Sequence, residues 1–301
     1  MSALPPLTAV RAFEAVARHL SFTRAGEELG MTQAAVSYQI KILEERVGAQ
    51  LFLRKPRQIA LSETGARLAP PVRQAFEALR DAFAETRGTV DGLLSITTVP
   101  TFASNWLAQN LGLFQIAHPN IAVRLDSGSA MVDLQSDGFD IGIRTVVTPQ
   151  PGLVAHLLVK ADFSPLLSPA LASSIGGVTR PEDLLKLPML DPQDEWLDQW
   201  FAAAGVEGYS SVGRSVSYLG LQSLLGTAAM AGRGVAMLTP AFFRDEISSG
   251  RLLQPFPLLA SAGRGYYLVY PEGRRNSPKI RAFRDWILPA TAAMRPGEPR
   301  A

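Results

Sequence analysis

The sequence predicts a multidomain α/β protein with an N-terminal winged helix-turn-helix, a linker helix and a C-terminal two-lobed α/β domain. Three observations predict this fold class. Two short helical segments flank a tight Gly-Met-Thr turn and precede a basic hairpin, a long segment carries an apolar stripe, and two later series alternate strands with helices. The three domains are expected at residues 1–61, 62–90 and 91–301.

The composition is that of a packed globular protein, since 47% of the 301 residues are hydrophobic and 19% are charged. The absence of cysteine excludes disulfides, zinc fingers and thiol catalysis, and three histidines give no support for a histidine-rich metal site. Residues 1–60 hold eight basic against five acidic side chains, an excess that suits DNA binding. No signal peptide or membrane span is evident, so a cytoplasmic protein without a membrane partner is expected.

Three helices are predicted in the first fifty residues. Apolar residues recur at helical spacing over 7–17, and a second helix over 22–29 lies between a Ser21 N-cap and Gly30. Thr32 is expected to cap the third helix. Its inward stripe consists of Val36, Ile40, Leu43 and Val47.

The outward face of the third helix carries short polar or flat side chains and one cation. Such side chains can approach base edges in the major groove, and a cation can contact phosphate. With the N-cap included, the candidate residues for reading double-stranded DNA are Thr32, Gln33, Ala34, Ser37, Tyr38 and Lys41.

A wing is predicted after these helices, because two short apolar segments, 51–53 and 59–61, flank a basic tip that contains Pro56. Three cations in this tip suit the DNA backbone or minor groove, namely Arg54, Lys55 and Arg57. The alternative is a small helical bundle with a solvated basic turn. That alternative does not explain why the helix caps, the turn, the polar helix face and the basic hairpin all fit a winged helix-turn-helix.

A linker helix is predicted to begin at Ser62 and to end near Thr86, with Pro70 and Pro71 kinking or dividing it. Its apolar seam consists of Val72, Ala75, Phe76, Leu79, Ala82 and Phe83. An exposed seam of this kind normally pairs with a second copy, which predicts a homodimer. Packing of the seam on the chain's own C-terminal domain is the alternative.

The segments RAFEAVARHLSFTRA (11–25) and LSETG (61–65) resemble the DNA-binding domain of LysR-type transcriptional regulators, in the branch typified by glycine-cleavage activators and β-lactamase regulators. The resemblance implies winged domains paired through linker helices, a homotetramer, and base-reading positions at Gln33, Ala34, Ser37 and Tyr38. RNA polymerase is a further candidate partner. Relatives often have proline at position 34 and arginine at position 38, so the base preference does not carry over.

From Gly92 the pattern predicts a largely parallel α/β sheet in each of two lobes with a cleft between them. Strands are expected at 93–99, 122–126, 139–144, 163–167, 212–218, 235–238 and 266–270. Helices are expected at 104–117, 196–204, 222–231 and 278–288.

Ligands of such sheets sit beyond the carboxyl ends of strands, where helix N-termini point their amides. Two places fit this rule: Pro100, Thr101 and Phe102 before one helix, and Gln222 and Ser223 at the start of another. Facing helix N-termini favour a small anion such as a carboxylate. The alternative is that Thr101, Gln222 and Ser223 are capping residues only.

The resemblance continues in the segments FDIGIR (139–144), AGRGVAM (231–237) and YYLVYP (266–271), which are similar to the effector domain of the same family. It implies a fold like periplasmic binding proteins, with lobe I at about 91–162 and 267–301, lobe II at about 163–266, and crossings near 162–165 and 264–267. It also implies pocket positions for Thr101 and Tyr266. Ser127, Ser129 and Arg144 follow neighbouring strands and are further effector candidates, although Arg144 could instead pair with Asp140 or a surface carboxylate.

The function expected is therefore a DNA-binding regulator controlled by a small effector between the lobes, with no other cofactor. An exported solute-binding protein would lack the helix-turn-helix. An enzyme is not expected, because the segment GYSSVG (208–213) lacks the second glycine of a nucleophile elbow and no phosphate-binding loop, dinucleotide fingerprint or HExxH motif occurs.

Overall fold

The computed structural model describes residues 4–55, 58–86, 92–134, 137–209 and 219–295. The chain forms two compact units, Met1–Thr89 and Val90–Ala301. Within the described residues, no helix combines the length and the apolar character needed to cross a membrane.

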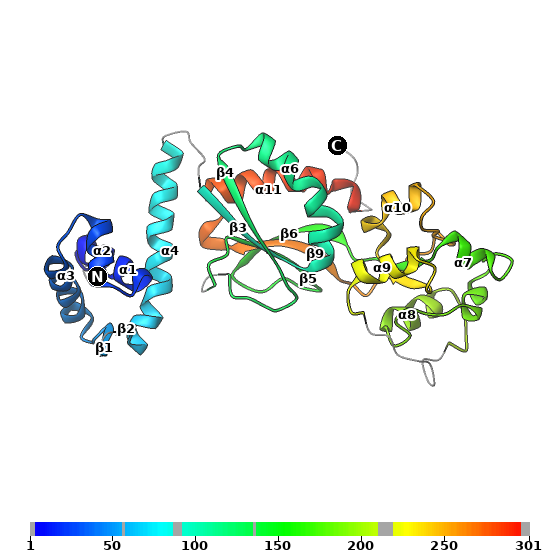
Figure 1. Cartoon of the computed structure of the whole chain (residues 1–301), viewed down its shortest axis with the longest axis horizontal. Helices are drawn as coiled ribbons and strands as arrows, with labels where there is room; N and C mark the ends of the chain where they lie inside the picture. The colour runs from blue at the N-terminus through cyan, green and yellow to red at the C-terminus, as the bar shows by residue number, and fades with distance from the viewer. Residues whose placement is uncertain (1–3, 56–57, 87–91, 135–136, 210–218, 296–301) are drawn as a thin grey trace. The chain divides into compact units, whose positions relative to one another are not determined.

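The first unit is a helical domain with a two-stranded hairpin (Figure 1). Its elements are α1 (Leu7–His19), α2 (Phe22–Leu29), α3 (Gln33–Val47), β1 (Phe52–Lys55), β2 (Gln58–Leu61) and α4 (Glu63–Thr86). Strands β1 and β2 pair antiparallel. The predicted helix-turn-helix and the hairpin of the wing are confirmed.

The predicted capping residues mark the ends of α2 and α3 in the helix-turn-helix. Ser21 Oγ accepts a hydrogen bond from the Arg24 N–H at 3.3 Å, and Thr32 Oγ1 accepts one from the Ala35 N–H at 3.1 Å. Gly30 ends α2 with φ of 65°, a left-handed conformation that glycine adopts without steric cost. Local sequence therefore determines the tight turn between α2 and α3.

One apolar core joins the three helices to the hairpin. The ring of Phe52 lies 5.6 Å from that of Phe13 and 5.8 Å from that of Phe22. Helix α3 contributes buried Val36, Ile40 and Leu43. Val47 was expected on the same inward stripe, but it is 40% exposed, because the last turn of α3 extends past the core. The prediction for Val47 is wrong.

Helix α4 continues through Pro70 and Pro71, so its predicted division at these prolines is wrong. Two adjacent prolines remove two N–H donors, and the hydrogen bonds of the remaining residues maintain the helix. The beginning of α4 packs on the core of the first unit through Leu68, Ala69 and Val72. Farther along the helix, Leu79 is 44% and Phe83 is 65% exposed.

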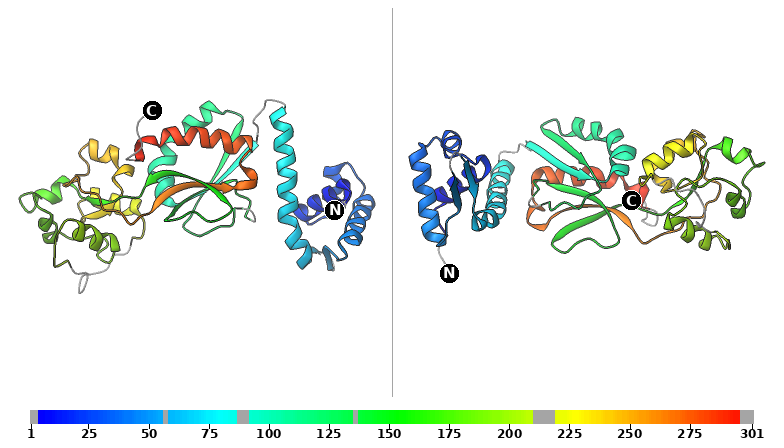
Figure 2. Two further views of the ribbon diagram at one scale, coloured as in Figure 1. Left: turned by 180° about the vertical axis from the view of Figure 1, so that it is seen from behind. Right: turned by 60° about the horizontal axis from the view of Figure 1, so that its bottom comes forward.

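The second unit has two lobes. Lobe I, which both ends of the unit's sequence form, is built on a five-stranded sheet with the strand order β4-β3-β5-β9-β6 (Figures 1 and 2). The strands are β3 (Gly92–Thr98), β4 (Ile121–Ser127), β5 (Ile141–Val146), β6 (Leu153–Lys160) and β9 (Gly265–Pro271). Strand β3 pairs parallel with β4 and β5, whereas β9 pairs antiparallel with β5 and β6. The expectation of a largely parallel sheet is wrong for β6 and β9, and β6 itself was not predicted.

Two helical segments pack on one another and on this sheet. One is a continuous helical run made of α5 (Pro100–Phe102), a π-helical turn (Ala103–Leu107) and α6 (Ala108–Ala117), and the other is α11 (Pro278–Ala290). Phe114 of α6 lies 5.2 Å from Phe283 and 5.3 Å from Trp286 of α11. The first run begins four residues earlier than the predicted helix at Ser104, which places Thr101 and Phe102 in its first turn.

Lobe II, the second part of this unit, is built around the short antiparallel pair β7 (Ser164–Leu166) and β8 (Ala236–Leu238). Its helices are α7 (Pro169–Ser173), α8 (Glu195–Ala203), α9 (Gln222–Met230) and α10 (Arg244–Ser248). A separate apolar core includes Trp200 and Phe163, and the Phe163 ring stacks on Trp196 at 4.4 Å. The strand expected near 212–218 lies outside the described residues.

The chain passes between the lobes through two connections that run side by side. The Ala161 N–H donates to the Arg264 carbonyl at 3.0 Å. Phe163 and Ala260 exchange both backbone hydrogen bonds, each at 2.9 Å. The two connections therefore form a short paired ribbon between β6 and β7 on one side and before β9 on the other.

Candidate functional sites

The exposed face of α3 is the first candidate site. Val36, Ile40 and Leu43 are buried on the opposite side of this helix, so their burial fixes which side chains face solvent. Gln33, Ala34 and Lys41 are exposed, and Tyr38 is 63% exposed. Ser37 is half-buried beside them. The predicted base-reading residues thus share one surface of the helix-turn-helix.

The positive charge of this unit lies partly beyond what the structure describes. Arg54 and Lys55 lie on β1, and their side chains are outside the described part, as is Arg57 altogether. Lys41 Nζ lies 3.9 Å from Glu45 Oε1 on the solvent side of α3. Exposed pairs of this kind contribute little to stability, so Lys41 can exchange its partner for a phosphate.

A charged cluster holds α1 against α2 and so positions α3. Arg18 donates to Glu14 at 3.1 Å and to Glu28 at 2.6 Å, and His19 Nε2 lies 2.6 Å from Glu28 Oε2. The hydrogen bonds from Arg18 and His19 lower the pKa of Glu28 to about 2. The same carboxylates raise the pKa of Arg18 above its ordinary value.

The second candidate site is a cavity of 660 Å³ between lobe I and lobe II. Five of the predicted effector residues line it: Pro100, Thr101, Ser129, Gln222 and Tyr266. Residues of both lobes and of the second connection complete its wall, including Thr145, Asp191, Asp194, Glu195, Trp196, Ala262 and Arg264. The volume is within the range of sites that bind small molecules.

Gln222 joins three elements at the floor of this cavity. Its Nε2 donates to Tyr266 Oη at 3.1 Å, and its Oε1 accepts from the Thr239 N–H at 2.7 Å. Tyr266 is 4% exposed, and its burial raises the pKa of the phenol to about 12, so the group stays neutral. A further hydrogen bond links Tyr266 to the Thr145 side chain.

Four of the predicted effector residues do not line the cavity. Phe102 is buried in the core, with its ring 5.9 Å from that of Phe242. Ser127 and Ser223 lie outside the lining. Arg144 donates to Thr97 Oγ1 at 2.6 Å, and burial lowers its pKa. Asp140 does not pair with Arg144, whereas the exposed carboxylate of Asp126 acts on its charge, in line with the alternative of a surface carboxylate.

Asp140 has other partners in lobe I. Lys279 Nζ lies 2.8 Å and Arg274 Nη1 lies 3.6 Å from Asp140 Oδ1, and the second carboxylate oxygen accepts from the Ser95 N–H at 2.8 Å. These contacts tie β3 to the segment that begins α11.

An acidic wall on lobe II was missed by the sequence reading. Asp191 and Asp194 line the cavity beside Glu195, and Asp194 caps α8 through the Trp196 N–H at 2.9 Å. Burial raises the pKa of both aspartates, and for Asp194 the neighbouring carboxylates add to this effect. The DPQDE run before a helix was the available signal, but acidic residues are common there as caps.

Comparisons with known proteins identify the families of both parts of the chain. Residues 7–66 match the model described as "Bacterial regulatory helix-turn-helix protein, lysR family", and residues 87–292 match "LysR substrate binding domain". The chain is 36% identical over 286 residues to the transcriptional activator AmpR of Providencia stuartii, covering 94% of this chain and 95% of the relative. It is 35% identical over 292 residues to the glycine cleavage system transcriptional activator of Escherichia coli K12, and the match covers 96% of this chain and 95% of that relative.

Solved structures show the same architecture. The effector binding domain of AmpR from Citrobacter freundii is similar with a TM-score of 0.59 and 30% identity, covering 67% of this chain and all of that domain. CrgA of Neisseria meningitidis, a LysR-type regulator, shares the fold over 94% of this chain and 98% of its own, with a TM-score of 0.57 and 23% identity.

Proposed function

Because this chain belongs to the LysR family of transcriptional regulators, we propose that it reads DNA with α3 and the wing and that a small effector between its lobes controls this activity. The function is that of a DNA-binding regulator, not of an enzyme. The observation that carries the proposal is the exposed face of α3. Gln33, Ala34 and Tyr38 project into solvent from this face, and the opposite face of the helix is buried in the core.

On DNA, Thr32, Gln33, Ala34, Ser37 and Tyr38 would lie against base edges, and the cations would contact phosphates. These cations are Lys41, Arg54, Lys55 and Arg57. Base contacts provide sequence specificity, whereas phosphate contacts provide affinity that falls with salt.

A second copy of the chain is the proposed partner of α4. Leu79 and Phe83 are 44% and 65% exposed on a helix whose beginning packs on the DNA-reading unit. Pairing of this face with its symmetry copy would bury both side chains and set two recognition helices at a fixed spacing. We further propose a homotetramer that works in the cytoplasm, with RNA polymerase as a partner at the promoter.

For the effector we propose a small molecule that carries a carboxylate and also hydrogen-bond donors. The carboxylate would face Thr101 and the start of α9, whose N-cap Leu221 offers no side-chain hydrogen bond to the free amides. The donors would face Asp191, Asp194 and Glu195. A ligand with a carboxylate alone would meet these three acidic side chains, and among the described lining residues only Arg264 offsets them.

The test is a gel-shift titration of the full chain on DNA from upstream of its neighbouring operon. Gln33→Ala combined with Tyr38→Ala should abolish the specific complex, whereas Arg251→Gln, an exposed cation of lobe II, should leave it intact. A specific complex that survives the double substitution would remove α3 from the interface.

A further inference from the structure

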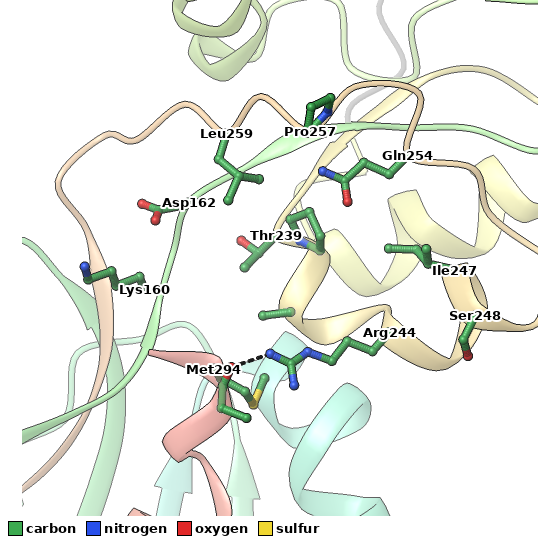
Figure 3. A pocket seen from close by; sticks show the side chains of 13 residues that line it. Lys160, Asp162, Thr239, Arg244, Ile247, Ser248, Gln254, Pro257, Leu259 and Met294 are labelled. Atoms are coloured by element: carbon green, nitrogen blue, oxygen red, sulfur yellow. Dashed lines mark hydrogen bonds between the residues drawn. The ribbon is translucent and has the colours of Figure 1, made fainter. Parts of the chain in front are cut away.

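A second cavity lies between the lobes, beside the paired connections (Figure 3). Its volume is 410 Å³, which is within the range of sites that bind small molecules. Lobe I contributes Lys160 at the end of β6 and Met294 near the last helical turn. Lobe II contributes Thr239 after β8, and Arg244 and Ile247 from α10.

The two cavities lie on opposite faces of the connections. Ala262 and Arg264 line the effector cavity, whereas Leu259, Lys160 and Asp162 line the second one. Side chains along paired extended segments alternate between two faces, and these residues follow that alternation. The second cavity is therefore separate from the site already described.

The charge and the lining favour an anion with an apolar body. Lys160 and Arg244 supply two positive charges, and Asp162 supplies one negative charge. Between them lies a mostly apolar wall formed by Pro240, Ala241, Ile247, Pro257, Leu259 and Met294. Arg244 uses Nη2 to donate to the Ala293 carbonyl, and its guanidinium keeps further N–H donors for a ligand.

Thr239 gives an independent indication of a ligand. The residue is 1% exposed, and its hydroxyl is buried without a hydrogen-bond partner. Figure 3 shows this side chain directed into the space between Asp162 and Arg244. Buried hydroxyls are almost always paired in folded proteins, so an oxygen left unpaired in a cavity wall is suited to a group that enters from outside.

We propose that this second cavity binds a small carboxylate with a short apolar chain. The carboxylate lies between Arg244 and Lys160 with Thr239 as an additional hydrogen-bond partner, and the chain lies along Ile247 and Leu259. Both lobes supply contacts, so occupancy depends on the angle between them.

Calorimetric titration of the full chain with hexanoate tests the proposal, with hexanamide and hexylamine as neutral and cationic matches. Hexanoate should bind with a Kd of about 1 mM or tighter. The amide and the amine should bind at least about 10-fold more weakly, because they lose the charge-assisted hydrogen bonds. Absence of binding up to about 20 mM hexanoate, or equal binding of hexylamine, would overturn the proposal.

Three substitutions locate the binding. Arg244→Gln should weaken hexanoate binding about 10-fold or more. Thr239→Val should raise the Tm of the free protein, since it removes an unpaired hydroxyl, and should also weaken hexanoate binding; a purely structural threonine would not give both effects. Thr101→Val alters the effector cavity only and should leave hexanoate affinity unchanged. Native affinity in both Arg244→Gln and Thr239→Val would place the binding elsewhere, without bearing on the function proposed above.

Discussion

Gln222 Nε2 donates to Tyr266 Oη at 3.1 Å, and this hydrogen bond joins α9 of lobe II to β9 of the lobe I sheet. The other end of the same amide accepts from the Thr239 N–H, so both polar groups of Gln222 are engaged. One N–H of Nε2 and one lone pair of Oε1 remain for an effector, which would then bond to the same side chain that joins the lobes. The hydrogen bond is therefore a contact through which an effector can change how the lobes are joined.

Tyr266→Phe should lower the free energy of unfolding by roughly 0.5–1.5 kcal/mol, because it removes the hydrogen bond from Nε2 of the half-buried Gln222. Urea denaturation of the full chain measures this change. Tyr267→Phe, on the same strand, is the matched control and should have a smaller effect. Combination of Tyr266→Phe with Gln222→Leu should cost less than the sum of the single changes; strict additivity would contradict the coupling.

Thr101→Val should weaken effector binding by about 1–3 kcal/mol, since it keeps the shape of the side chain and removes its hydroxyl from the cavity wall. The paired measurement is calorimetry with the effector and a gel shift without it, and DNA affinity should not change. Ser127→Ala, outside the cavity lining, serves as the control. Normal effector binding by Thr101→Val would make this residue structural.

Gln33→Ala should cost roughly 1–3 kcal/mol on the specific site and leave binding to unrelated DNA nearly unchanged, because base contacts carry sequence information. Lys41→Ala should instead weaken both kinds of DNA and reduce the magnitude of the log–log salt slope by about one. The two substitutions can be compared by titration at several salt concentrations. Equal losses on both DNAs for Gln33→Ala would contradict base reading.

Leu79→Asp should dissociate the dimer, because each copy would place a carboxylate in an apolar interface facing its symmetry mate. Sedimentation velocity measures the mass of the full chain, and Arg80→Ala on the same exposed turn controls for the loss of any one side chain. A mutant that sediments as the wild-type oligomer would assign this face of α4 another role.

The stability of the first unit should depend on Glu28 at low pH. Its pKa is about 2 in the folded protein against 4.5 for an ordinary glutamate, so the carboxylate stabilises the fold above pH 4.5 and loses this contribution as the pH falls towards 2. Glu28 is 39% exposed, so the effect at pH 7 should stay below about 1 kcal/mol. Chemical denaturation of wild type and Glu28→Gln should show a difference at pH 7 that shrinks at pH 3; a constant difference would exclude this origin.

The parts of the molecule that the sequence predicted depend on short-range chemistry. Ser21, Gly30 and Thr32 act within one turn of their own position, so the helix-turn-helix could be placed to the residue. In the sheet of lobe I, β9 pairs with two strands that lie more than a hundred residues earlier in the chain. No local pattern shows that β9 returns antiparallel between β5 and β6.

The same limit applies to the effector cavity. Gln222 and Tyr266 were each predicted as site residues, but their hydrogen bond joins positions 44 apart and follows only from the fold. Phe102 was misplaced because the helix begins at Pro100 and turns this ring into the core. The acidic wall was not predicted, because Asp194 has the sequence context of an ordinary helix N-cap. Asp194 does cap α8, in addition to lining the cavity.

The ribbon formed by the two connections has a cavity on each side. Ala161 bonds to Arg264 and Phe163 to Ala260, so the two connections would move together if the angle between the lobes changed. Rocking that narrows one cavity widens the other. Occupants of the two cavities should therefore oppose each other, each lowering the affinity for the other by the same factor.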